Sequence, residues 1–337
     1  MTGYAEGVSL SPRSGPERED GGATRPQGPL DHSSSGTSPR VLLEEKKRQG
    51  LTLSVCLPAL DEAATVGDIC RSVSENLVAH GFVDELVVVV DSRSTDGTAE
   101  AAAAAGASVF MSAELRPEVP VGAGGKGDVL WRSLAAASGD LIVWMDADLT
   151  LFDPSFVPKL VAPLLMDEEV MFVKGRYRRD LDPGSGPGGG GRVTELVARP
   201  LLNLFYPELA HIVQPLAGEM AGRREALASL PVVTGYGVEV ALLIDMWRRF
   251  GPTGVAQVDL GERHHRSRDL QALGRAAHQI MQAVLARLES EGRIKLDDEL
   301  PQSLVQFVND ADRLLVLETS NVVEERPPFG SIGGHLP

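Results

Sequence analysis

The chain has 337 residues, of which 43% are hydrophobic and 23% charged, so it can form one large or two modest globular domains. Its formal net charge of −15 argues against a nucleic-acid partner or an anionic membrane surface. No apolar run reaches the roughly 18 to 20 residues that span a bilayer, and the N-terminus lacks a signal-peptide core. Cys56 and Cys70 show no metal or redox spacing. We therefore expect a cytoplasmic protein with buried thiols.

Residues 1–40 are rich in glycine, proline, serine and charge, which predicts a disordered tail. From Leu51 the pattern becomes regular. The runs "LTLSVCL", "ELVVVV", "ASVFM", "LIVWM" and "VMFVKG" are typical of buried strands, and helical segments separate the first four of them. This alternation predicts an α/β fold, a Rossmann-like, mainly parallel sheet with helices on both faces.

After Tyr177 the alternation stops, and a glycine-rich stretch opens a helix that carries Leu196, Val197, Leu201 and Leu202. Further on, the pattern predicts a helix over residues 238–249, a strand "GVAQVDL" and a long helix over residues 270–288. We expect a nucleotide-binding half over residues 41–178 and an acceptor-binding half over residues 179–292. The remaining residues 293–337 are predicted to form an acidic, loosely held tail.

The stretch "LIVWMDADLT" ends a buried strand on two like charges, Asp146 and Asp148, separated by Ala147. In open α/β sheets ligands bind beyond the carboxyl ends of the strands, where these aspartates are expected. Two neighbouring carboxylates stay ionised when a cation compensates them, and Mg²⁺ or Mn²⁺ suits carboxylates together with phosphate oxygens. The alternative is a surface loop whose aspartates cap the next helix.

Two further loops follow predicted strands. "PALDEA", residues 58–63, carries Asp61 and Glu62, and "DSRSTDGT", residues 91–98, begins with Asp91. These side chains could bind a nucleobase or ribose, or could simply cap the following helices.

"GAGGKG", residues 122–127, matches a dinucleotide fingerprint only formally, because no strand precedes it. It is not a Walker A motif, since Asp128 follows Gly127. The loop could present Lys126 to an anionic ligand at a helix start, or Lys126 could be a mobile surface lysine.

"GGGGRVTE", residues 188–195, places glycines before a helix whose first turn offers backbone N–H groups, Arg192 and Thr194. This combination suits a phosphate monoester, although a linker before a capped helix gives the same pattern.

"GYGVEV", residues 235–240, puts Glu239 in a first helical turn, where a solvated acid is also ordinary. "ERHHRSRDL", residues 262–270, follows a strand with two histidines and three arginines. A histidine could complete a metal site with Asp148 while the arginines bind phosphates, or the segment could be a basic surface turn.

Taken together, these motifs, with "PVGAGGKGDVLWRSL" and "QPLAGE", resemble in order and spacing the actinobacterial glucosyl-3-phosphoglycerate synthases, which are retaining glycosyltransferases of the GT-A fold. The resemblance covers roughly residues 52–279. It implies transfer of glucose from UDP-glucose to D-3-phosphoglycerate by a metal-dependent, homodimeric enzyme that uses Mg²⁺ or Mn²⁺.

The resemblance also implies roles for individual residues. Asp148 and His265 would bind the metal, and Asp146, Asp148, Glu239 and Arg263 would form the catalytic set. The nucleotide and sugar would contact Pro58, Ala59, Leu60, Glu62, Ser92, Lys126, Asp146, Ala147, Tyr236, Glu239, Arg263, Ser267 and Arg268. The 3-phosphoglycerate would contact Gly191, Arg192, Val193 and Thr194.

This sequence departs from the family pattern at Arg93, where a glycine is usual, and at Ser267, where an asparagine is frequent. The donor base and the fine acceptor contacts therefore stay open. The alternatives are a mannosyl counterpart that uses GDP-mannose, a membrane-associated polyprenyl-phosphate glycosyltransferase, for which no apolar anchor is visible, and a non-catalytic nucleotide-sugar sensor.

Overall fold

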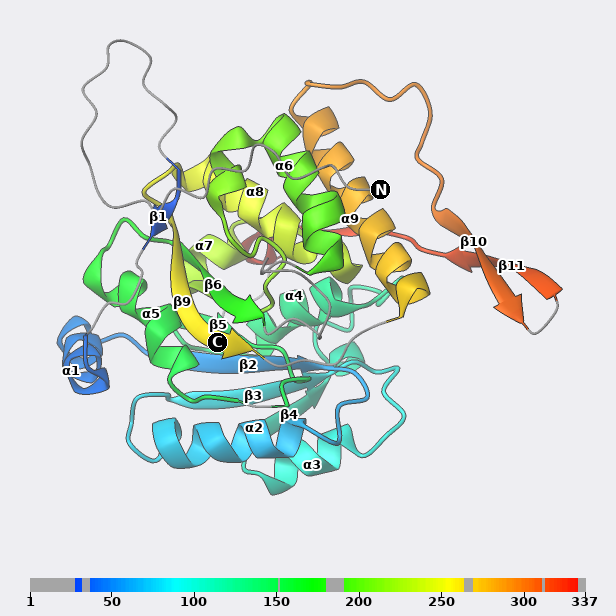
Figure 1. Ribbon diagram of the computed structural model, residues 1–337. Coiled ribbons are helices and arrows are strands. Elements are labelled where there is room, and N and C mark those ends of the chain that lie inside the picture. Colours follow the sequence, from blue (N-terminus) through cyan, green and yellow to red (C-terminus); the bar gives the residue numbers. More distant parts are fainter. Residues whose placement is uncertain are drawn as a thin grey trace, which may run out of the picture.

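The computed structural model describes residues 28–31, 37–150, 152–179, 191–263, 269–310 and 313–332. Within these ranges an eight-stranded sheet forms the centre of the molecule, in the order β1-β9-β6-β7-β5-β2-β3-β4 (Figure 1). The pairings are parallel except for those of β7 with β5 and β6, so the predicted mainly parallel sheet is confirmed. Its strands are β1 (Leu30–Asp31), β2 (Leu53–Ala59), β3 (Glu85–Val90), β4 (Ser108–Met111), β5 (Leu141–Trp144), β6 (Phe172–Arg179), β7 (Met220–Arg223) and β9 (Val255–Arg263).

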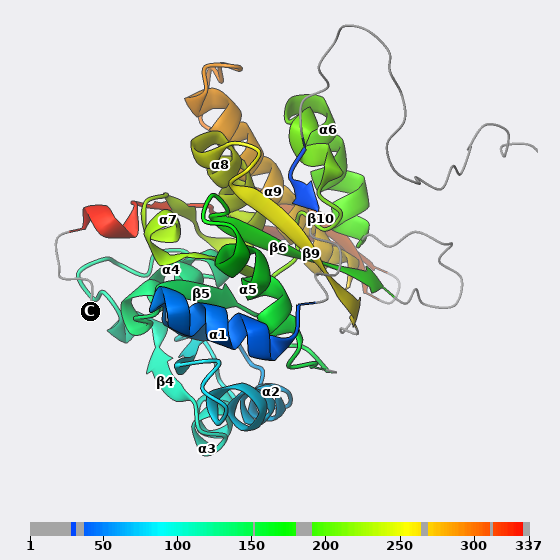
Figure 2. The same cartoon turned by 90° about the vertical axis from the view of Figure 1, so that its left-hand side faces the viewer.

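Helices cover both faces of this sheet. One hydrophobic cluster packs α1, α2, α3 and α5 against one face, and a second packs α4, α6, α7, α8 and α9 against the other. Figure 2 shows α1 lying beside α5 on the first face. No helix in the described part of the chain is long and apolar enough to cross a bilayer. The helices are α1 (Pro39–Gln49), α2 (Val66–Val73), α3 (Thr98–Ala104), α4 (Lys126–Ala136), α5 (Phe156–Met166), α6 (Arg199–Phe205), α7 (Arg224–Ala228), α8 (Val238–Phe250) and α9 (Leu270–Ser290).

The central strands are apolar on both sides because both sides are covered. In β3, Val87 and Val89 belong to the cluster under α4, whereas Val88 and Val90 belong to the cluster under α2. Successive side chains of a strand point to opposite faces, so an unbroken valine run fits a sheet with two buried faces.

Helix α1 was not predicted, because it lies before the regular pattern begins. The Ser38 hydroxyl accepts a hydrogen bond from the Val41 N–H at 3.4 Å, Pro39 opens the helix, and Gly50 ends it with a left-handed φ of 68°. The buried Lys46 ammonium donates to the Phe82 carbonyl at 2.9 Å and fixes the helix to the start of β3. Most of the predicted N-terminal tail, residues 1–27 and 32–36, lies outside the described residues.

Strand β7 was also missed, and it decides where the later strands point. It pairs antiparallel with both β5 and β6, so β6 runs in the direction of β5, and β9 is parallel to β6. The carboxyl ends of β2, β3, β5, β6 and β9 therefore share one edge of the sheet. In an α/β sheet this edge is where ligands bind.

The part of the C-terminal segment that follows its hairpin is packed into the fold, which corrects the prediction of a loosely held tail for these residues. Two strands, β10 (Ser303–Asp310) and β11 (Arg313–Ser320), form an antiparallel hairpin, drawn in orange in Figure 1. Beyond it, β12 (Glu325–Arg326) pairs with β8 (Val232–Val233). Phe329 is buried edge-to-face against Trp131, with ring centroids 5.5 Å apart. The contacts of β12 with β8 and of Phe329 with Trp131 join segments about 90 to 200 residues apart in sequence, which local patterns cannot reveal.

Replacement of Phe329 tests whether the C-terminal segment belongs to the core. We expect Phe329→Ala to lower the free energy of unfolding by about 3 kcal/mol, because it removes a buried aromatic side chain. The exposed Leu204→Ala variant on α6 should change it by less than about 0.5 kcal/mol. Urea denaturation measures both values, and equal small effects would show that the segment adds nothing to the core.

Candidate active site

A pocket of about 270 Å³ lies at the sheet edge where β2, β3 and β5 end. The predicted residues that line it are Pro58, Ala59, Leu60, Glu62, Lys126, Asp146, Ala147, Asp148 and Tyr236. It is also lined by Asp91, Arg93, Ala123, Gly124, Gly125, Val129, Gly235 and Gln279, which were not in the predicted site. The strand ends, the start of α4 and the turn before α8 thus meet around one cavity.

Lys126 joins two of the predicted carboxylates. Its ammonium lies 2.5 Å from Asp146 Oδ1 and 2.6 Å from Glu239 Oε1. Burial by itself would lower the pKa of Lys126, but attraction to the two carboxylates outweighs it and raises the pKa above its usual range. Lys126 is therefore a fixed cation and not a mobile surface lysine.

The Asp146–Asp148 turn is held from two sides. The Thr65 hydroxyl, at the start of α2, donates to the Ala147 carbonyl at 2.6 Å. On the other side lies Gly218, where an added Cβ would meet the Asp146 carboxylate oxygens at 2.1 and 2.3 Å. Asp146 can keep its place beside Lys126 only because residue 218 has no side chain.

A second buried lysine supports Gly218 from behind. Lys174 in β6 is fully buried, and its ammonium donates to the carbonyl of Ala217. The Gly175 N–H donates to the carbonyl of Glu219 at 2.9 Å. Burial lowers the pKa of Lys174 to about 8, against the attraction of Glu239 and Glu219. Neither Lys174 nor "QPLAGE" was assigned a role in the site, although the motif was part of the resemblance.

The loops after β2 and β3 hold each other in place. The Asp61 carboxylate accepts from the Thr95 N–H at 2.7 Å, and the Asp96 carboxylate accepts from the Ala63 N–H at 3.0 Å. Asp61 lies in the left-handed region with φ 55°. The geometry therefore supports a structural role for Asp61 and Asp96, which hold the two loops together.

Arg93, the position at which the resemblance led us to expect glycine, lines the pocket. Its guanidinium pairs with Asp91 through Nε–Oδ1 at 2.9 Å and Nη2–Oδ2 at 2.7 Å. Burial would raise the pKa of Asp91, but the hydrogen bonds from Arg93 outweigh it and lower that pKa. The paired guanidinium lies beside Gly124 and Gly125, where an added Cβ would meet it at 3.7 to 3.9 Å, so it lines the pocket next to the glycine-rich loop.

Ser92 and Tyr236 differ in how they relate to the pocket. The Ser92 hydroxyl accepts from the Ala113 N–H at 2.9 Å and contacts the Ser112 hydroxyl at 3.1 Å, so it faces the neighbouring loop and does not line the cavity. Tyr236 lines the cavity, and its N–H donates to the Gln279 side chain of α9 at 2.9 Å. Gln279 is a wall residue that no local motif singles out.

The predicted acceptor residues, Gly191 to Thr194, open a helix away from the described pocket lining. Arg192 and Val193 are helical, and the Glu195 N–H donates to the Gly191 carbonyl at 2.9 Å. Thr194 begins a π-helical turn, Thr194–Ala198, that leads into α6 and packs against α9. The helix start predicted after the glycine-rich stretch is therefore confirmed.

The remaining predicted residues lie at the end of β9 or after it. Arg263 is its last residue and pairs in register with Arg179, at the sheet edge that carries the pocket. The predicted residues His265, Ser267 and Arg268 lie outside the described part of the chain.

The pocket offers hard oxygen ligands for a divalent cation at Asp148 and Asp146. Among the described residues, no group of three or more histidine, cysteine, aspartate or glutamate side chains gathers to hold a metal. A cation here would therefore need ligands beyond the described side chains, such as the oxygens of a diphosphate. The oxygen donors fit Mg²⁺ or Mn²⁺ in that role.

Comparison with known proteins is consistent with this geometry. Residues 54–228 match the model of glycosyl transferase family 2. The chain is 46% identical over 305 residues to the glucosyl-3-phosphoglycerate synthase of Mycolicibacterium smegmatis, covering 90% of this chain and 97% of that protein. This chain belongs to the glucosyl-3-phosphoglycerate synthase family.

Solved structures of family members and relatives share its architecture. The Mycobacterium tuberculosis glucosyl-3-phosphoglycerate synthase in complex with Mn²⁺, UDP and glucosyl-3-phosphoglycerate has a TM-score of 0.79 and 42% identity, covering 90% of this chain and all of that one. The mannosyl-3-phosphoglycerate synthase of Rubrobacter xylanophilus has a TM-score of 0.82 and 39% identity, covering 90% and 97%. The fold is thus the GT-A glycosyltransferase fold, as predicted, and the chain is a glycosyltransferase.

Gly218→Ala tests whether the contact behind Asp146 matters in this family member. We expect glycosyl transfer to fall about 100-fold, because the new Cβ displaces a carboxylate of the site by an ångström or more. Gly97→Ala adds a Cβ with nothing within 4 Å and should retain activity. Steady-state kinetics measures both, with thermal unfolding to check that Gly218→Ala is folded. Full activity in a folded Gly218→Ala protein would refute the role of this contact.

Proposed function

We propose that this chain transfers glucose from UDP-glucose to D-3-phosphoglycerate, giving glucosyl-3-phosphoglycerate and UDP, with Mg²⁺ or Mn²⁺ as cofactor. The observation that carries the proposal is the Lys126 bridge to Asp146 and Glu239, in a pocket that also contains Asp148. The M. tuberculosis relative, solved with Mn²⁺, UDP-glucose and phosphoglyceric acid, supports the choice of substrates.

In this proposal the uridine lies at the end of the pocket formed by Pro58, Ala59 and Leu60, with Glu62 and Ser92 nearby. The diphosphate lies beside Lys126, whose raised pKa keeps it charged at every physiological pH. Asp146 and Glu239 orient the sugar hydroxyls, and Tyr236 covers the opposite wall. All of these residues except Ser92 and Glu239 line the pocket. Glu239 is connected to it through its ion pair with Lys126.

Asp148, with His265, would hold the divalent cation. When bound, the cation acts as a Lewis acid that stabilises negative charge on the departing diphosphate. Lys126, together with Arg263 and Arg268, would add positive charge at the same phosphates.

The acceptor is placed by its phosphate. A phosphate dianion could be bound by two side chains and two backbone groups at this helix start. They are the Arg192 guanidinium, the Thr194 hydroxyl and the backbone N–H groups of Arg192 and Val193. Once the acceptor is held, its hydroxyl oxygen bonds to the anomeric carbon while the bond from that carbon to the UDP oxygen breaks. The hydroxyl proton leaves with the diphosphate. We propose attack on the face from which UDP departs, and hence retention of configuration.

The rival donor is GDP-mannose. The R. xylanophilus mannosyl-3-phosphoglycerate synthase shares the fold at a TM-score of 0.82. Arg93, which lines the pocket, is where this chain departs from the pattern that the resemblance led us to expect. The two nucleotide sugars must therefore be compared directly as donors.

The hairpin β10–β11 supports a homodimer. Among its residues Val305, Phe307 and the consecutive run from Leu314 to Leu317 are exposed, so both faces of the hairpin carry apolar side chains. An isolated two-stranded hairpin is at best marginally stable in water. Figure 1 shows it projecting from the body of the molecule. We infer that a second copy of the chain covers it.

We also place the enzyme in the cytoplasm. Both cysteines, Cys56 and Cys70, are free and buried, as suits a reducing compartment. Burial raises the pKa of each thiol to about 12, so neither is a nucleophile of the reaction.

A donor comparison tests the function directly. With 3-phosphoglycerate and Mg²⁺, release of nucleoside diphosphate should be at least about tenfold faster from UDP-glucose than from GDP-mannose, in line with a pocket that discriminates by hydrogen bonds. A chelator should abolish both rates. Exclusive use of GDP-mannose would assign the mannosyl activity instead. Turnover with neither donor, together with normal nucleotide binding, would favour the non-catalytic sensor.

The homodimer is tested at the hairpin. Light scattering of the wild-type chain should give twice the mass of one chain, and Phe307→Glu with Val316→Glu should shift it to one, because two charges are buried unpaired in the interface. Val41→Glu, at an exposed apolar position on α1, serves as the control and should stay dimeric. A wild-type monomer at micromolar concentration would refute the inference.

A further inference from the structure

The C-terminal segment crosses behind the pocket loop that carries Lys126. After the hairpin, β12 pairs with β8, and the Trp131 indole N–H donates to the Pro327 carbonyl at 2.9 Å. Trp131 belongs to α4, whose first residue is Lys126. The last described residues of the chain therefore contact the helix that presents the central cation of the site.

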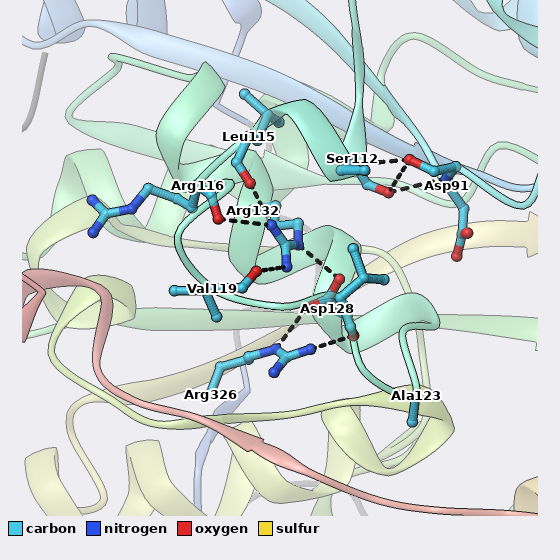
Figure 3. Close-up of polar contacts among 12 residues, drawn as sticks. Asp91, Ser112, Leu115, Arg116, Val119, Ala123, Asp128, Arg132 and Arg326 are labelled. Carbon is cyan, nitrogen blue, oxygen red and sulfur yellow. Dashed lines mark hydrogen bonds and ion pairs between the residues drawn. The ribbon is translucent and has the colours of Figure 1, made fainter.

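Arg326 makes the contact with the loop itself. Its buried guanidinium donates through Nε to Asp128 Oδ1 at 2.6 Å and through Nη2 to the carbonyl of Val121 (Figure 3). Val121 precedes the glycine-rich loop, and Asp128 follows it. One side chain from residue 326 thus holds both ends of the loop that contains residues 122–127.

Asp128 connects this contact to a second arginine. Its other oxygen, Oδ2, accepts from Arg132 Nε at 2.8 Å, and Arg132 Nη2 donates to the Val119 carbonyl at 2.8 Å (Figure 3). Arg132 also donates to the carbonyls of Leu115 and Arg116. Asp128 is almost fully buried and pairs with two guanidinium groups that fix successive parts of residues 115–121.

The loop needs such external support because of its composition. Gly122, Gly124 and Gly125 have φ values of 58°, 61° and 91°, a region open to glycine, and glycine contributes little rigidity of its own. Glu324 adds a further contact, since its carboxylate accepts from the Ala123 N–H at 3.3 Å. An added Cβ at Gly122 would meet that carboxylate at 2.1 Å.

Glu324, just before β12, also supports the turn that precedes α8, which lies next to the glycine-rich loop. The Thr234 N–H donates to the Glu324 carbonyl at 2.8 Å, and the Glu324 N–H donates to the Thr234 hydroxyl at 2.9 Å. Thr234 directly precedes Gly235 and Tyr236, which line the pocket. Residues 324–326 therefore lie behind two walls of one cavity.

We propose that Arg326 is a positioning residue of the donor site, which holds the loop over residues 121–126 so that Lys126 reaches Asp146 and Glu239. Arg326 does not line the pocket, and it acts through Asp128 and the loop backbone. The kinetic part of this inference rests on the proposed donor, whereas the ordering of the loop does not.

The test compares two buried arginines in the full-length protein. Arg326→Ala should lower kcat/KM for the donor about 10- to 100-fold, as expected when a catalytic group is misplaced by about an ångström, and leave the KM for 3-phosphoglycerate within about twofold. Arg326→Lys, which can reach only one of the two partners, should show an intermediate loss. Arg224→Ala is the matched control, because the Arg224 guanidinium is also buried and also donates to backbone carbonyls, those of Leu134 and Ala137 at the far end of α4, and it is bonded to neither Val121 nor Asp128.

Hydrogen exchange of the 121–127 amides gives a readout that needs no ligand. We expect faster exchange in Arg326→Ala and Arg326→Lys than in the wild type, and unchanged exchange in Arg224→Ala. The inference is overturned if the Arg326 variants exchange like the wild type, or if both arginine positions change the loop amides and the donor kinetics equally. A wild-type protein without turnover of UDP-glucose would contradict the proposed function alone, because the exchange result stands by itself.

Discussion

The site depends on one ion triad, in which Lys126 lies between Asp146 and Glu239. These three residues begin α4, follow β5 and begin α8, so the contact joins three elements that are remote in sequence. The carboxylates of Asp146 and Glu239 are partly buried and both contact the Lys126 ammonium. They would repel each other without this cation between them. The raised pKa of Lys126 shows the same interaction from the side of the cation. The pocket can keep its shape only while this charge is in place.

The sheet brings these residues to one edge although a single antiparallel strand, β7, lies among parallel strands. β7 is antiparallel to both of its neighbours, and this restores β6 and β9 to the direction of β5. The chain therefore leaves β9 at the edge where Asp148 lies, although β9 is three places away from β5 in the sheet. The crossover through α5 returns the chain so that β6 runs parallel to β5, and β7, Met220–Arg223, is inserted between them in the opposite direction.

The sequence alone was sufficient for those parts of the site that local patterns encode. Buried strands that end in carboxylates predicted Asp146 and Asp148, and a glycine loop before a helix predicted Lys126. Gly218 and Arg326 could not be found in this way, since each acts on a residue 72 or about 200 positions away. The same holds for the fold. Periodicity located the main strands, whereas the C-terminal segment was taken for a tail because its pairing partner, β8, has only two residues.

The charges of the described side chains in the pocket favour a divalent cation when a nucleoside diphosphate binds. Among the described side chains at the catalytic end, Lys126 supplies one positive charge, whereas Asp146, Asp148 and Glu239 supply three negative charges. Behind them, Lys174 and Glu219 offset each other. These carboxylates would therefore repel a diphosphate that enters this region, because Lys126 is already paired with two of them. Two added charges from a cation at Asp148 bring this end of the pocket to neutrality, and the diphosphate oxygens then complete the coordination that the protein side chains leave incomplete.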